Sequence, residues 1–269
     1  MRSKDFEGKV VVVTGSSRGI GRETARLFAR SGATVVINGR RRDLLVAVAP
    51  VLTAGGFEVG VYEGDVTAAE DARGLIEYAA SFTGRIDVLV NNAGISMRGP
   101  FEETSPEVIE QVTRVNILGA ALPTRFAIPY LAESGGSVVF VSSLAGIRGF
   151  PGIAVYSAAK MALTGLTQAL RSELTPRGIH VGLLWVSFTE NDPDKQIYSA
   201  DGSLMSIKRS WKTSQAEVAE AVVELVRRRR AERAMTAQGK LFVLLNRLFP
   251  GLVAFLIRRS KGAVHTYSQ

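Results

Sequence analysis

The stretch Lys9-Val-Val-Val-Val-Thr-Gly-Ser-Ser-Arg-Gly-Ile-Gly21 decides the fold of this chain. Its β-branched run suits a parallel strand, because such strands are buried on both faces and are apolar throughout. The residues that follow, up to Arg30, read as a helix with Gly32 just beyond its end. The sequence therefore predicts a strand, a glycine-rich turn and a helix in direct succession.

The glycines of this turn suit a dinucleotide site. They let the backbone approach a pyrophosphate, and the helix N-terminus offers unpaired N–H groups and a positive dipole end. The spacing Gly15-x-x-x-Gly19-x-Gly21 differs by one residue from the general dinucleotide fingerprint. A glycine-rich loop alone can also be an ordinary turn, so the prediction needs support from the rest of the chain.

A second pattern indicates acid/base chemistry. Positions i and i+4 share one helix face, so the ammonium group of Lys160 can lie beside the phenol of Tyr156. A neighbouring cation lowers the pKa of a phenol from its usual value near ~10. Ser143 precedes the tyrosine by thirteen residues and can hydrogen-bond a substrate oxygen. Each residue alone would more often be structural, but together they favour catalysis.

With Asn91-Asn-Ala-Gly94 and Asn116, these motifs occur in the order and spacing of the short-chain dehydrogenase/reductase superfamily. The chain resembles this family over roughly residues 6–192. The resemblance implies that Tyr156 is the catalytic acid/base and that Ser143 holds the substrate carbonyl oxygen. It also implies that Lys160 tunes Tyr156 and binds the nicotinamide ribose, while Asn116 holds a water in a proton relay.

The same resemblance implies a set of cofactor-binding residues. Asn92, Ala93 and Gly94 match the turn that passes the adenosine ribose, and Asp65-Val66 match the pair that contacts the adenine. The complete set is Gly15, Ser17, Arg18, Gly19, Ile20, Gly21, Arg40, Asp65, Val66, Asn92, Ala93, Gly94, Tyr156 and Lys160. Read without the family, Asp65 could begin a helix and Asn116 could bond the local backbone.

The end of the second predicted strand bears on the choice of cofactor. An acid there would bond the adenosine 2′-hydroxyl of NAD, whereas an arginine pairs with the 2′-phosphate of NADP. Gly39 stands where the acid is expected, Arg40 follows it, and Arg18 adds a second cation. In this family the pattern favours NADP(H), and with it carbonyl reduction, although residues 40–42 could be a solvated turn.

Alternating strand and helix patterns predict a single α/β domain, a Rossmann-type doubly wound parallel sheet with helices on both faces. Six strands are expected at 9–14, 33–38, 57–63, 86–91, 136–142 and 178–185, with no seventh in the tail. Helices are expected at 18–30, 43–54, 68–82, 105–132 and 155–174. We divide the chain into an NADP-binding catalytic core (1–192) and a lid loop with a C-terminal helical tail (193–269).

Composition limits the other classes of protein. Cysteine is absent, and His180 and His265 lie far apart, so we expect no metal site. The net charge of +8 raises a scaffold or nucleic-acid-binding protein as a rival, but no nucleic-acid module is recognised. A nucleotide-sugar epimerase or dehydratase is a further alternative, but such a protein would carry Gly-x-x-Gly-x-x-Gly, which this chain lacks. We expect a cytoplasmic homodimer or homotetramer without a secretory signal.

The chain departs from the family pattern after its sixth predicted strand. Val186-Ser187 replaces the usual Pro-Gly, and Thr189 or Asn191 would have to contact the nicotinamide amide. The Pro- and Gly-containing segment 192–203 suits a mobile lid over an apolar or lipid-like carbonyl substrate. Four apolar side chains could line a pocket but are assigned to the core: Met97, Phe150, Phe188 and Trp211.

The tail combines basic and apolar segments. Arg227-Arg-Arg-Arg230 precedes the apolar stretch 241–257, which Arg247 and Pro250-Gly251 interrupt. The stretch is shorter than the ~20 residues of a spanning helix. We favour two helices that dock on the catalytic domain or a second subunit, and keep peripheral membrane contact as the alternative.

Overall fold

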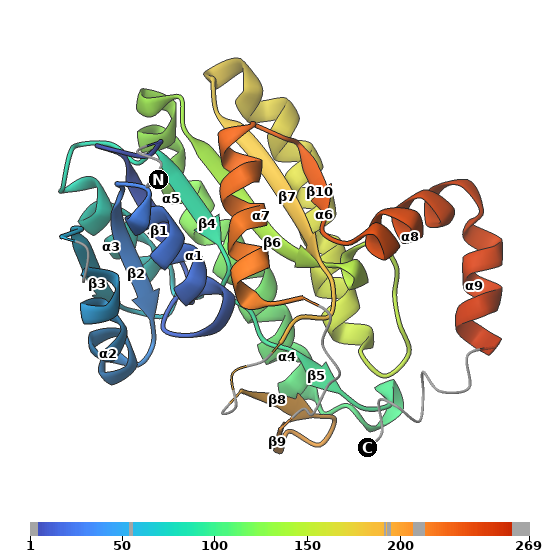
Figure 1. Cartoon of the computed structure of the whole chain (residues 1–269). Helices are drawn as coiled ribbons and strands as arrows, with labels where there is room; N and C mark the ends of the chain where they lie inside the picture. Colours follow the sequence, from blue (N-terminus) through green and yellow to red (C-terminus); the bar gives the residue numbers. More distant parts are fainter. Residues whose placement is uncertain (1–4, 54–55, 191, 193–194, 207–212, 260–269) are drawn as a thin grey trace.

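The computed structural model describes residues 5–53, 56–190, 192, 195–206 and 213–259. At its centre is a seven-stranded sheet in the order β10-β7-β6-β4-β1-β2-β3, with every neighbouring pair parallel (Figure 1). Its strands are β1 (Val10–Val13), β2 (Thr34–Gly39), β3 (Val59–Glu63), β4 (Val88–Asn91), β6 (Ser137–Ser143), β7 (His180–Val186) and β10 (Glu232–Ala234). The predicted doubly wound parallel sheet is confirmed.

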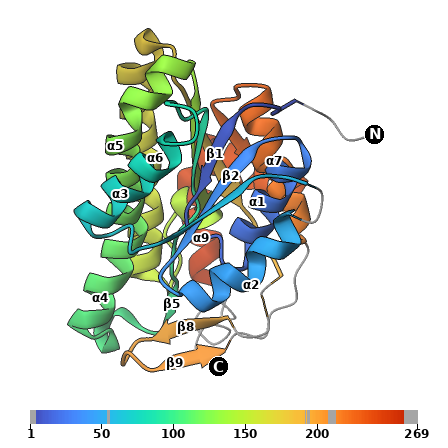
Figure 2. The ribbon, with the colours of Figure 1, turned by 90° about the vertical axis from the view of Figure 1, so that its left-hand side faces the viewer.

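Helices cover both faces of this sheet, as Figure 2 shows from the side. One face carries α1 (Gly19–Arg30), α2 (Arg42–Thr53) and α7 (Gln215–Arg227), and the other carries α3 (Ala69–Ala80), α5 (Gly119–Ser134) and α6 (Ala154–Leu174). Alternate residues of β1 enter the two cores: Val11 and Val13 face α1, while Val10 and Val12 face the opposite layer. This double burial explains the uninterrupted valine run.

The helix expected over residues 105–132 contains a wider turn. α4 (Pro106–Thr113) continues through a π-helix at Arg114–Leu118 into α5. Asn116 lies in this turn, and its Nδ2 donates to the carbonyl oxygens of Val112 and Ile95, both at 2.8 Å. Single 3₁₀ turns complete the helices: η1 (Phe101–Glu103), η3 (Leu144–Gly146) and η4 (Thr175–Arg177).

The prediction of six strands was wrong, because β10 adds a seventh next to β7. Glu232 pairs with Leu183 and Ala234 with Trp185. β10 has three residues, no β-branched side chain and only one buried position, so its strand character comes from its buried neighbour and not from its own sequence.

The segment expected as a lid loop is a hairpin. β8 (Gln196–Ser199) and β9 (Leu204–Ser206) are antiparallel, and β8 also pairs with β5 (Met97–Arg98). The tail forms α8 (Ala237–Leu248) and α9 (Pro250–Arg259). Within the described ranges no single helix is long and apolar enough to cross a membrane; α8 and α9 together would be, but they bend by 118°.

Candidate active site

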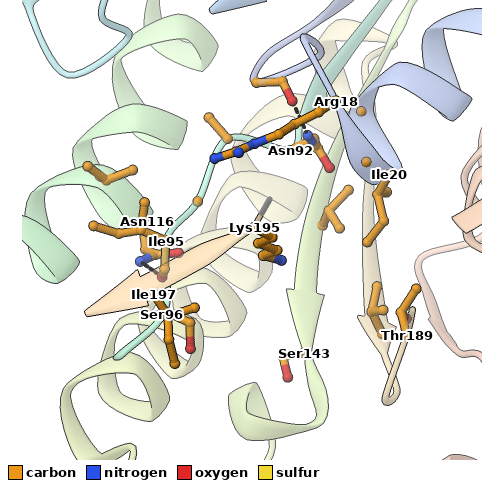
Figure 3. A pocket seen from close by; sticks show the side chains of 18 of the residues that line it. Arg18, Ile20, Asn92, Ile95, Ser96, Asn116, Ser143, Thr189, Lys195 and Ile197 are labelled. Carbon is orange, nitrogen blue, oxygen red and sulfur yellow. Dashed lines mark hydrogen bonds between the residues drawn. The ribbon is translucent and has the colours of Figure 1, made fainter. Parts of the chain in front are cut away.

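A cavity of about 430 Å³ lies beyond the carboxyl ends of β1, β2, β4, β6 and β7. Ligand pockets commonly lie there in doubly wound folds. Figure 3 shows Arg18 and Asn92 at one end, Ser143 and Thr189 at the other, and Lys195 between them. The lining includes the complete predicted set of catalytic and cofactor-binding residues: Gly15, Ser17, Arg18, Gly19, Ile20, Gly21, Arg40, Asp65, Val66, Asn92, Ala93, Gly94, Asn116, Ser143, Tyr156 and Lys160.

The glycine-rich turn has a geometry that requires glycine. Gly15 and Gly19 adopt φ values of +61° and +62°, where a side chain is strained. A Cβ on Gly21 would lie 2.5 Å from Asn92 Nδ2 and would collide with the Gly15 carbonyl oxygen. α1 begins at Gly19 with no side-chain cap and no acidic residue in its first turn. Its first N–H groups therefore suit a bound phosphate.

Hydrogen bonds join this turn to the segment after β4. Thr14 Oγ1 accepts from the backbone N–H groups of Asn92 at 3.0 Å and Ala93 at 3.1 Å. In return, Asn92 Nδ2 donates to the carbonyl oxygens of Thr14 and Gly15, both at 3.0 Å. The two turns therefore form one rigid wall of the cavity.

The residues predicted to act in acid/base chemistry lie at the other end of the cavity. Lys160 is buried on α6, and its Nζ lies 5.8 Å from the ring centroid of Tyr156 and donates to Val141 O at 3.1 Å. Burial, and next the positive charge of Lys195, lower the pKa of Lys160 to about 8. Ser143 ends β6, and its Oγ accepts from the Ala145 N–H at 3.2 Å.

Asn116 completes this group through an unpaired acceptor. Its Nδ2 is used within the chain, but its buried Oδ1 has no hydrogen-bond partner among the described residues. A Cβ on Gly94 would lie 2.8 Å from this oxygen and 3.4 Å from Lys160 Nζ, so both atoms converge on Gly94. A buried unpaired oxygen beside a lysine suits an ordered water.

Positive side chains gather where β2 ends. Arg40 and Arg18 are exposed and line the cavity, whereas Arg41 lies outside the lining and pairs with Asp43 at 2.6 Å. A Cβ on Gly39 would lie 3.4 Å from Ser17 Oγ. The turn is therefore divided: Arg40 faces the cavity, and Arg41 belongs to a solvated ion pair.

The structure adds lining residues that sequence patterns missed. Phe150 and Phe188, assigned to the core, line the cavity instead, and Phe188 is 52% exposed. Met97 is buried as expected, while Trp211 and Asn191 lie outside the described residues. Other additions include Ile95, Ser96, Glu190, Asp192, Lys195, Gln196, Ile197 and Gln215. Only the lid position of residues 192–203 hinted at any of them.

Two further site predictions can be compared with the geometry. Thr189 lines the cavity, and its Oγ1 donates to Ser187 O at 3.0 Å. Asp65 lines it too and its Oδ1 accepts from the Thr67 N–H at 3.0 Å, but it does not begin the next helix, because α3 has Ala68 as its N-cap. In the described part of the chain, no three His, Cys, Asp or Glu side chains are grouped to hold a metal.

Comparison with known proteins places this α/β fold and cavity in a family. The model of the short chain dehydrogenase family matches residues 9–201. An uncharacterised oxidoreductase of Methylorubrum extorquens is 41% identical over 180 residues, 66% of this chain and 72% of that protein. The 11-beta-hydroxysteroid dehydrogenase-like protein 4A of Arabidopsis thaliana is 33% identical over 258 residues, 93% of this chain and 84% of that one.

A solved structure agrees with these matches. The short chain dehydrogenase/reductase of Burkholderia phymatum, crystallised in complex with NAD, has a TM-score of 0.81 at 25% identity and covers 93% of this chain and 96% of its own. The fold and site define an oxidoreductase of the Rossmann type. The chain belongs to the short-chain dehydrogenase/reductase family.

Proposed function

We propose that this protein reduces a ketone or aldehyde to an alcohol with NADPH, and that the substrate is apolar. The observation that carries the proposal is the convergence of Tyr156, Lys160 and the free Oδ1 of Asn116 at one end of a cavity whose other end holds Arg18 and Arg40.

The residues divide the chemistry between them. The nicotinamide cofactor, when bound, supplies a hydride to the carbonyl carbon. The Ser143 hydroxyl holds the carbonyl oxygen, and the Tyr156 hydroxyl gives its proton to that oxygen as the bond to carbon becomes single. The ammonium group of Lys160 stabilises the resulting phenolate. A water held by Asn116 Oδ1 then returns a proton by way of Lys160.

The preference for NADPH is supported by charge. Arg40, and not an acid, follows Gly39 at the end of β2 and lines the cavity, and Arg18 lines it from the glycine-rich turn. These cations suit a 2′-phosphate better than a 2′-hydroxyl. The relative from Burkholderia phymatum holds NAD, so the proposal for this chain depends on its own Gly39-Arg40 pair.

The apolar substrate is supported by the apolar side chains in the cavity wall. Phe150, Phe188 and Ile197 lie in that wall, where they would contact the carbon skeleton of a substrate. The name of the Arabidopsis relative refers to a hydroxysteroid dehydrogenase, a class with an apolar substrate.

Absorbance of NADPH, followed with ketosteroids, 3-oxo lipids, quinones and simple aldehydes, tests the reaction. We expect Tyr156→Phe to lower kcat by about 10²-fold or more, since general acid catalysis contributes that much. Tyr130→Phe, at a half-buried tyrosine on α5, is the matched control and should leave kcat unchanged. Full activity in Tyr156→Phe would remove the assigned acid, and absence of both turnover and NADP(H) binding would favour a non-catalytic scaffold.

Arg40→Ala tests the choice of cofactor. Loss of a charge-assisted phosphate contact should raise the KM for NADPH by about tenfold and leave that for NADH nearly unchanged. Arg41→Ala removes a neighbouring arginine that pairs with Asp43 and serves as the control. Equal effects of Arg40→Ala on both cofactors would contradict the 2′-phosphate contact.

A further inference from the structure

The two tail helices carry a continuous row of exposed large apolar side chains. On α8 they recur at i, i+3 and i+7, and on α9 at i, i+3 and i+4, so each helix presents one apolar face. Seven of the fifteen exposed large hydrophobic residues in the described ranges belong to this row, each between 47% and 57% exposed. The row consists of Leu241, Leu244, Leu248, Phe249, Leu252, Phe255 and Leu256.

The opposite side of α8 is docked on the catalytic domain. The rings of Phe242 and Phe150 stack with centroids 5.8 Å apart, and Val243 packs against the core beside α6. Arg148 Nη1 donates to Asn246 Oδ1 at 3.0 Å and to Pro250 O at 3.1 Å, which holds the joint between the helices. The expected docking on the catalytic domain therefore uses the inner face and leaves the apolar row outside.

The charge of the tail indicates which kind of surface can bind to this apolar row. From residue 237 to 259 there is no acidic residue, and the four cations are all exposed: Lys240, Arg247, Arg258 and Arg259. The Arg259 guanidinium lies 5.7 Å from the centroid of the Phe255 ring, so cation and apolar face are adjacent. A second copy would bring two such cationic sets together in a symmetric interface, whereas anionic lipid headgroups would neutralise them.

We propose that α8 and α9 form a peripheral binding site for an anionic lipid surface. At 1.5 Å per residue the helices are about 15–18 Å long, well short of the ~30 Å hydrocarbon core. Their bend of 118° also prevents them from forming one straight span. The apolar row therefore lies in the plane of the interface, with the arginines among the headgroups. In Figure 1 α9 stands at the edge of the molecule, apart from the sheet, where a flat surface can reach it.

The position of α8 links this surface to the cavity. Phe150 and Leu144 line the cavity; the ring of Phe242 on α8 stacks on that of Phe150, and a Cβ on Gly239 of α8 would lie 3.4 Å from Leu144 Cδ2. Binding to a lipid surface would thus hold the cavity close to apolar carbonyl compounds that are dissolved in that lipid. This consequence rests on the proposed function, whereas lipid binding itself does not.

Vesicle co-sedimentation of the full chain, without substrate or cofactor, tests the proposal. We expect binding to vesicles of phosphatidylcholine with phosphatidylglycerol, and much weaker binding to phosphatidylcholine alone. Leu252→Gln/Leu256→Gln should weaken binding by about tenfold or more, because two apolar side chains no longer enter the interface. Arg258→Gln/Arg259→Gln should weaken it similarly, on anionic vesicles only.

Val46→Gln/Val51→Gln is the matched control, because these α2 side chains are 52% and 61% exposed and lie outside the tail; its binding should equal that of the wild type. Equal sedimentation of the wild type and Leu252→Gln/Leu256→Gln would overturn the proposal, as would no binding to anionic vesicles. Light scattering that shows a dimer which the tail variants dissociate, without vesicle binding, would assign the row to a second copy. Any of these failures would leave the proposed reaction untouched.

Discussion

Lys160 shows how burial and a nearby positive charge change the pKa of a lysine. The residue is 5% exposed, and its ammonium group donates to Val141 O. Burial and the charge of Lys195 bring its pKa to about 8, within reach of physiological pH. A lysine that can release and recover a proton near neutrality suits the proposed relay to Tyr156 better than a fully solvated one.

Lys195→Gln should move the pH profile of carbonyl reduction. Reduction consumes a proton, so kcat should fall as pH rises through the pKa of Lys160, about 8 in the wild type. Removing the repulsive charge of Lys195 raises that pKa, and the falling limb should move to higher pH by about one unit or less. Lys240→Gln, an exposed lysine of the tail, is the control. If the falling limb of the Lys195→Gln profile stays in place or moves to lower pH, the charge of Lys195 does not lower the pKa of Lys160.

Among the elements, the π-helical turn and the turn after β4 build the site jointly. The wide turn at Arg114–Leu118 presents Asn116, and Asn116 Nδ2 ties the turn to Ile95 O beyond Gly94. Glycine at position 94 allows the close approach of Asn116 Oδ1 and Lys160 Nζ. The two elements lie apart in the sequence, and the distance between them in the folded chain decides whether a water fits between them.

Gly94→Ala should damage the site, since its Cβ would lie 2.8 Å from Asn116 Oδ1 and forced shifts of this kind cost about 1–3 kcal/mol. We expect kcat/KM to fall by about tenfold or more and the unfolding temperature to fall as well. Gly165→Ala on α6 is the control, because nothing lies within 4 Å of its Cβ. It should stabilise the helix by about 0.5–1 kcal/mol. Equal kinetics in both variants would contradict the tight packing at Gly94.

Across the whole molecule, the basic run 227–230 secures the edge of the sheet. Arg227 pairs with Asp5 at 3.3 Å, and Arg228 pairs with Glu224 at 3.0 Å. Arg229 donates to Gly135 O at 2.9 Å and Gly178 O at 2.7 Å. Much of this charge therefore serves the fold, which weakens the nucleic-acid-binding alternative raised by the net charge of the chain.

His180 joins the same edge to the core and should make stability depend on pH. Its Nε2 lies 2.9 Å from Arg230 O and its Nδ1 lies 3.2 Å from Ser137 Oγ. Burial chiefly lowers its pKa, against the raising effect of the Arg230 carbonyl. The unfolded chain then binds the proton more readily, so stability is fully present above about pH 6.5 and falls as the pH drops below it.

Chemical denaturation between pH 7 and pH 5 measures this effect. His180→Gln should flatten the pH dependence of the free energy of unfolding, and it should cost about 1 kcal/mol at neutral pH for the altered buried hydrogen bonds. If the free energy of unfolding of His180→Gln depends on pH as in the wild type, groups other than His180 cause the loss of stability at low pH.

How far the sequence predicts this protein depends on how local each feature is. The strand of the valine run and the helix α6 follow from local sequence patterns, and both were predicted. β10 was missed because Glu232-Arg-Ala234 has no strand pattern of its own and pairs with β7 only in the folded chain. Phe150 and Phe188 were misassigned because an apolar side chain looks the same in a core and in a cavity wall.

The sequence by itself determined the parallel strands, the glycine turn and the shared helix face of Tyr156 and Lys160. Each depends on residues within one or two turns of the backbone, where spacing dictates which side chains share a face. Only the tertiary structure decided that Asn116 Oδ1 meets Lys160 over Gly94, that Lys195 enters the cavity, and that the tail keeps an apolar row outside. These contacts join segments far apart in the chain, and packing alone sets their distances.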